Sequence, residues 1–211
     1  MKLETLQSQA VFLFGVLAAL ALQVAVEGVI PHTLNETASA AGPEVARLTA
    51  FFVLITAYYL EACGFFDQYT NPSGKSRSRR AYFPDFLVEF LRFMLFFALA
   101  GFVRVHASET DQPTATSGRF AVGVFIVLAY DVYVAYLSET VGYFRKDLNW
   151  ELPDYVWHRI YASEGVAALI GTIMVASNYL SLGWDLDLVA AAVAGLYGFY
   201  GLGVLAIRET R

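Results

Sequence analysis

Residues 45–66 read VARLTAFFVLITAYYLEACGFF, a run of 22 residues with few polar side chains. A helix needs about 20 mostly apolar residues to cross the hydrocarbon core of a bilayer, so this run is long enough. It nevertheless contains Glu61 near its end. A charged carboxylate at the centre of a span costs ~2.5–3.5 kcal/mol on insertion scales. Because Glu61 is present despite this cost, we expect it to have a function or to be paired with another group.

The composition of the whole chain is that of a membrane protein. Of 211 residues, 57% are hydrophobic and 16% are charged, and the mean hydropathy is +0.52. Soluble domains have about 25% charged residues. We therefore expect one polytopic transmembrane domain over residues 1–211, integral to a prokaryotic plasma membrane and surrounded by lipid. The net charge of −5 gives no basic surface for nucleic acid.

Six apolar runs reach membrane-spanning length, which predicts an all-α protein with six transmembrane helices. The predicted spans are residues 10–30, 45–66, 83–105, 119–144, 156–180 and 186–207.

The basic residues between these spans predict the orientation. Ten of them fall on one side and three on the other, so the positive-inside rule places both termini in the cytoplasm. The ten are Lys2, Lys75, Arg77, Arg79, Arg80, Arg145, Lys146, Arg159, Arg208 and Arg211, and the three are Arg47, Arg104 and Arg119.

A short pattern occurs twice. Residues 57–66, AYYLEACGFF, and 135–144, AYLSETVGYF, both match A-Y-x-x-E-x-x-G-[FY]-F. Each is followed by a polar segment and a helix start containing Pro-Asp, FPDF at 83–86 and LPDY at 152–155. We infer an internal duplication of a two-helix unit, spans two and three matching spans four and five. The alternative is a chance likeness between aromatic-rich helix ends.

Several ionisable side chains are predicted inside the cytoplasmic half of the spans. A tyrosine three residues before a carboxylate shares its helix face, so its phenol can donate a hydrogen bond to the acid. Five carboxylates against one arginine at this depth predict that some acids are protonated, hydrated or occupied by a cation. The carboxylates are Glu61, Glu139, Glu164, Glu89 and Asp131, and the supporting residues are Arg92, Tyr58, Tyr136 and Tyr161.

This acidic layer favours a cation channel or a proton- or cation-coupled transporter, since carboxylates in a hydrated cavity attract and exchange cations. Apart from such a cation, no cofactor is predicted. One alternative is an enzyme that acts on a lipid-like substrate through carboxylates and a divalent metal, but no His-based metal motif or partnered serine nucleophile is present. Enzymatic activity is therefore less favoured. A second alternative is a non-catalytic subunit whose charges pair with another membrane chain.

The last span carries small residues at helical spacing, Ala191, Gly195 and Gly198. Small residues let membrane helices approach closely. The pattern is typical of two arrangements, packing within one subunit and a contact between copies in a homo-oligomer, and the sequence does not distinguish them.

Overall fold

The computed structural model describes residues 3–33, 38–67, 69, 82–103, 118–144, 154–180 and 185–209. These residues form helices α1 (Leu3–Thr33), α2 (Ala38–Asp67), α3 (Tyr82–Val103), α4 (Arg119–Phe144), α5 (Asp154–Leu180) and α6 (Leu186–Glu209). All six are long and apolar enough to cross a membrane, which confirms the predicted helical membrane class. Helices α1 and α2 extend beyond the predicted spans because hydropathy detects the apolar part of a helix and not its polar ends.

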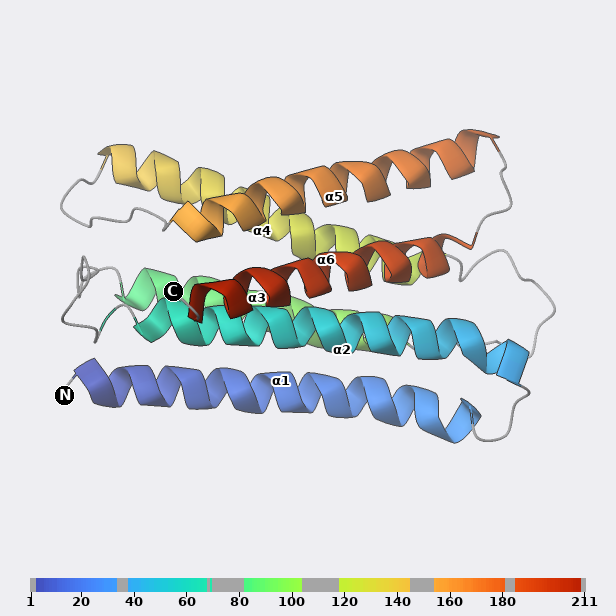
Figure 1. Ribbon diagram of the computed structural model, residues 1–211, viewed down its shortest axis with the longest axis horizontal. Helices are drawn as coiled ribbons and strands as arrows, with labels where there is room; N and C mark the ends of the chain where they lie inside the picture. Colours follow the sequence, from blue (N-terminus) through green and yellow to red (C-terminus); the bar gives the residue numbers. More distant parts are fainter. Residues whose placement is uncertain are drawn as a thin grey trace.

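The six helices form one bundle in which consecutive helices run in opposite directions (Figure 1). Helix α1 packs against α2 and α3, and α5 packs against α4 and α6 at the opposite edge. Helix α2 lies between them, in contact with α1, α3 and α6. It is the most enclosed span, with 56% of an 18-residue apolar stretch buried, whereas α5 is the least enclosed, with 22% of such a stretch buried. The start of α1 and the end of α6 lie at the same end of the bundle, and we call that half the terminal half.

The outer surface of the bundle is apolar. Phe12 and Leu196 are each 73% exposed, and Phe83 is 69% exposed. Large apolar side chains on several helices cannot face water at this density, so the surface is suited to lipid tails. The prediction that both termini are cytoplasmic stays a prediction. Most of the basic residues behind it, including those of 75–80 and 145–146, lie outside the described residues.

Polar contacts, both local and between helices, cap helix ends far from the terminal half. Asp185 precedes α6, and its Oδ1 accepts the backbone N–H groups of Asp187 and Leu188, both at 3.1 Å. The Oδ1 of Asp187 accepts the N–H of Ala121 in the first turn of α4 at 3.0 Å. Arg47 Nε of α2 donates to the carbonyl of Val103 at the end of α3, at 3.1 Å. These contacts satisfy helix-end groups that have no partner within their own helix.

The small residues of α6 are buried or face another helix of the same chain. Ala191 is buried, and Gly195 and Gly198 face α2. A Cβ atom on Gly198 would lie 2.9 Å from Val53 Cγ1 and 3.1 Å from the backbone nitrogen of Leu54. The helices therefore approach closely here because glycine has no side chain. The homo-oligomer through this face stays a prediction, and it would need surface that α2 does not already cover.

The matched positions of the inferred duplication differ in their surroundings. Glu61 and Tyr58 of α2 are buried, whereas Glu139 and Tyr136, their counterparts on α4, are exposed. This arrangement does not confirm the duplication. Residues 152–153 of the second Pro-Asp helix start lie outside the described residues.

Gly198→Ala is expected to lower the melting temperature of the detergent-purified protein. The new methyl group meets backbone atoms of α2 that cannot rotate away, and overpacking of this kind costs ~1–3 kcal/mol. Gly203→Ala is the control, because no atom lies within 4 Å of its Cβ position. Equal melting temperatures for the two variants would contradict close packing of α6 on α2.

Candidate functional site

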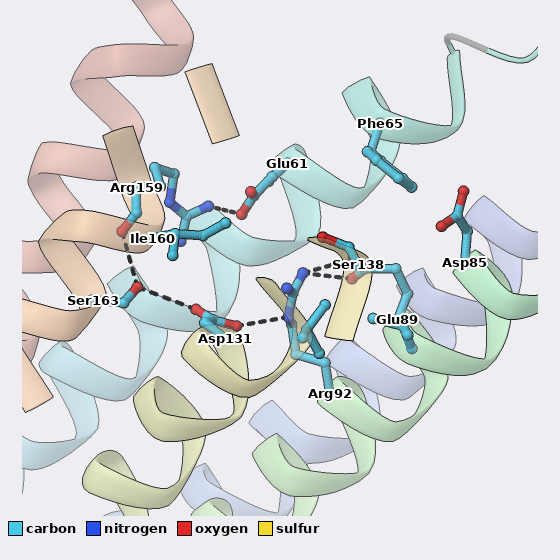
Figure 2. Close-up of a pocket in the computed structure, with 12 residues that line it drawn as sticks. Glu61, Phe65, Asp85, Glu89, Arg92, Asp131, Ser138, Arg159, Ile160 and Ser163 are labelled. Carbon is cyan, nitrogen blue, oxygen red and sulfur yellow. Dashed lines mark hydrogen bonds and ion pairs between the residues drawn. The ribbon is translucent and has the colours of Figure 1, made fainter. Parts of the chain in front are cut away.

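A pocket lies between α2, α3, α4 and α5 in the terminal half of the bundle (Figure 2). It holds about 570 Å³ of empty space, its open mouth included. Each of the four helices contributes both polar and apolar side chains to its wall. The lining residues are Glu61, Phe65, Asp85, Val88, Glu89, Arg92, Asp131, Val134, Ser138, Arg159, Ile160 and Ser163.

Two carboxylates share the guanidinium group of Arg92. Its Nη1 donates to both oxygens of Glu89, at 2.6 and 2.8 Å, one helical turn away on α3. Its Nε forms an ion pair with Asp131 Oδ1 of α4 at 3.0 Å. Asp131 lies nine residues before Thr140, where its span ends. At 1.5 Å per residue, that separation is about 14 Å. Arg92 therefore joins α3 to α4 well inside the membrane-spanning region.

Tyr58 of α2 connects the two arginines of the pocket. It is fully buried, and its hydroxyl donates to Asp131 Oδ2. The Cζ atoms of Arg159 and Arg92 lie 4.4 and 5.2 Å from the centre of its ring. A desolvated cation at this distance from an aromatic ring is stabilised by roughly 2 kcal/mol. The phenol oxygen thus donates a hydrogen bond to an acid, and the ring forms cation–π contacts with two guanidinium groups.

Arg159 of α5 forms the second ion pair. Its Nη1 contacts Glu61 Oε2 of α2, and its Nη2 donates to the hydroxyl of Tyr197 on α6 at 3.3 Å. The Ser163 hydroxyl lies 2.6 Å from that of Tyr197 and 3.3 Å from Asp131 Oδ2. We call Tyr58, Glu61, Glu89, Arg92, Asp131 and Arg159 the charge network. Five helices are joined through it and its hydroxyl neighbours.

The charge network contains one more acid than base. Glu61, Glu89 and Asp131 are 5–6% exposed, and Arg92 and Arg159 are 7% and 2% exposed. With every group ionised, three carboxylates and two guanidiniums leave one net negative charge. Asp85, which accepts a hydrogen bond from Tyr69, is a further acid on the pocket wall. An unbalanced charge is costly in a low-dielectric setting, so full ionisation of the charge network without a further positive charge is disfavoured.

The structure brings together only part of the acidic layer that the sequence predicts. Glu61, Glu89 and Asp131 line the pocket with Arg92, and Tyr58 lies behind them. Glu139 and Glu164 are exposed on the outside of α4 and α5. The tyrosines paired with them in the sequence, Tyr136 and Tyr161, are 68% and 63% exposed. These four residues therefore take no part in the pocket.

Helical phase explains this difference. Asp131 and Ser138 are seven residues apart, two helical turns, and both are buried on the inner face of α4. Glu139 follows Ser138 and is turned about 100° away from it. On α5, Arg159 and Ser163 share the inner face, and Glu164 is turned outward in the same way. The expected ratio of five acids to one arginine becomes three to two within the charge network.

Sequence reasoning missed Arg159, Ser163, Ser138 and Tyr197 as site residues. Arg159 is close to the start of its span and was counted with the boundary cations that set orientation. The available signal was the spacing of the polar residues: Arg159 and Ser163 are four apart, so they share a helix face. Among the described residues, no group of three His, Cys, Asp or Glu side chains is arranged to hold a metal ion.

Tyr58→Phe is expected to reduce the free energy of unfolding by ~1–3 kcal/mol, because Asp131 loses a buried hydrogen-bond donor. The aromatic ring beside the guanidiniums is retained. Equilibrium unfolding with SDS in mixed micelles measures the change, and Tyr136→Phe on the exposed face of α4 is the control. Equal effects of the two substitutions would contradict the hydrogen bond to Asp131.

Arg159→Gln is expected to cost ~3–5 kcal/mol, since Glu61 then remains buried without its cation. Adding Glu61→Gln should recover part of the loss, with a coupling energy of ~0.5–3 kcal/mol in a double-mutant cycle. The same cycle with Glu139→Gln should show additive effects. Additivity in both cycles would contradict the ion pair between Arg159 and Glu61.

Comparison with known proteins gives no relative. No protein-family model, curated protein or solved structure matches the chain. A function for this protein is therefore argued from the chemistry of the pocket and the charge network.

Proposed function

We propose that this chain is a membrane carrier in which a proton or small cation binds reversibly at the charge network and drives transport. The observation that carries the proposal is the shared guanidinium of Arg92, which faces both Glu89 and Asp131. One cation cannot neutralise two acids. A proton or cation that arrives at either carboxylate balances the charge and releases Arg92 to the other.

The distribution of polar residues favours a carrier over an open pore. Beyond the charge network, those described residues that are buried in the other half of the bundle are apolar, until Arg47 and Asp187 at its far end. Examples are Phe51, Phe96 and Leu128, all fully or almost fully buried. Ions do not cross tightly packed apolar side chains, so passage requires the helices to move. Rocking of helix groups around a polar site is the usual mechanism of such carriers.

The network joins α2, α3, α4 and α5 through contacts that depend on charge. Loss of one pairing on proton or cation binding therefore changes how these helices attract one another, which gives a physical link between binding and movement. The enzyme and the non-catalytic subunit considered from the sequence have no comparable observation in their favour.

Asp131→Asn is expected to slow proton or cation movement in reconstituted liposomes at least about tenfold, equivalent to ~1.4 kcal/mol in the barrier. The amide keeps the size of the side chain but cannot take up a proton or carry the negative charge. A pH-sensitive dye inside the vesicles reports proton movement under an imposed potential, and sodium and potassium uptake are measured in parallel.

Glu139→Gln is the matched control, because it removes a carboxylate that is exposed and outside the pocket. Its transport should stay within about twofold of the wild-type rate. Glu89→Gln provides a second test if Asp131→Asn does not fold. Wild-type rates equal to those of empty vesicles, or unchanged rates in folded Asp131→Asn and Glu89→Gln, would refute the proposal.

A further inference from the structure

The pocket is larger and more apolar than a proton or a bare metal ion requires. Its free space is about 570 Å³ when the open mouth is counted. Each helix around it supplies one apolar side chain to the wall: Phe65, Val88, Val134 and Ile160. Such a wall gains nothing from a hydrated ion, whereas it can cover the body of an organic molecule.

The carboxylate oxygens of Glu89 and Asp131 are poorly suited to coordinate an inorganic cation. Both oxygens of Glu89 accept from Arg92. The oxygens of Asp131 face Arg92, Tyr58 and Ser163. A sodium or potassium ion exchanges its water shell for several oxygen ligands, and these carboxylates have their oxygens engaged already. Their net negative charge nevertheless remains, and it attracts a cation that needs no direct coordination.

A free anion is also disfavoured. The guanidinium of Arg92 faces two acids, and that of Arg159 is paired with Glu61. The cations that an anion would need are thus already neutralised, and the excess charge of the charge network repels it. A neutral apolar molecule would fill the pocket without balancing its charge. A diffuse positive charge on an apolar body satisfies both the wall and the network.

We propose that the pocket binds a small organic monocation with an apolar body, such as an aromatic or branched alkylammonium ion, as the substrate of the proposed carrier. The apolar residues cover its body, the charge network provides the counter-charge, and the Phe65 ring offers a cation–π surface. This substrate class rests on the proposed transport function and makes it more specific.

The test is ligand binding to the purified full-length protein in detergent, measured by calorimetry. Benzyltrimethylammonium is the probe, with benzyl alcohol as the neutral analogue, benzoate as the anionic analogue, and potassium chloride as the inorganic cation. The organic cation should bind at least about tenfold more tightly than each of the others, a difference of ~1.4 kcal/mol. Equal or weaker binding of benzyltrimethylammonium would overturn the inference.

Two variants locate the binding. Val134→Phe places a larger side chain on the pocket wall without altering any charge, and it should reduce affinity at least about tenfold. Val175→Phe, at a position 58% exposed on α5, is the size-matched control and should leave affinity unchanged. Benzyltrimethylammonium binding that survives in folded Val134→Phe would place the ligand elsewhere and contradict the proposal.

Liposome flux separates this inference from the proposed function. Proton or cation movement that depends on Asp131, without binding of benzyltrimethylammonium, would refute the organic substrate and leave the carrier standing. Binding that is lost in Val134→Phe, without any transport, would refute the carrier and leave the pocket assignment standing.

Discussion

The burial of Arg92 and Arg159 beside three carboxylates is the constraint that organises the terminal half of this protein. A guanidinium cannot lose its charge in a protein, so each must have acids or aromatic rings close by. Apart from Glu89, which is on the same helix as Arg92, these partners are on other helices: Asp131 on α4, Glu61 and Tyr58 on α2, and Tyr197 on α6. The pairing therefore determines how the helices are placed around the pocket. Helix α1 supplies none of these charges and is held by stacked aromatic rings, Phe14 against Phe86 and Phe93.

The two halves of the bundle are stabilised mainly by different interactions, apolar packing in one and charged pairs in the other. In the half opposite the termini, the core consists mainly of closely packed apolar side chains. In the terminal half, charged pairs surround a partly empty space, and their energies change whenever a proton or cation arrives. A bundle built in this way has a stiff part and a part whose pairing energies depend on charge, and the proposed carrier would need both for alternating access.

The sequence predicts helix number and position well, because a span must be apolar over its full length. The third predicted span, 83–105, differs by at most two residues at either end from α3, Tyr82–Val103. Rotation about the helix axis is harder to predict. In a soluble protein the apolar face marks the inside, but here lipid and core are both apolar, so hydrophobicity does not distinguish them. The sequence correctly predicts five buried polar residues: Glu61, Glu89, Asp131, Arg92 and Tyr58. It wrongly places Glu139 and Glu164 with them. The inward-facing residues of those helices are the preceding serines, Ser138 and Ser163.

Helix α6 is the last of the six to be synthesised, yet it completes helices made before it. The N–H of Ala121 at the start of α4 depends on Asp187, and Arg159 of α5 depends on Tyr197. Until α6 inserts, a ribosome-bound chain holds an incompletely capped helix at one membrane boundary and an incompletely solvated cation near the other. The order of synthesis therefore leaves polar groups of α4 and α5 without these partners until α6 enters the membrane.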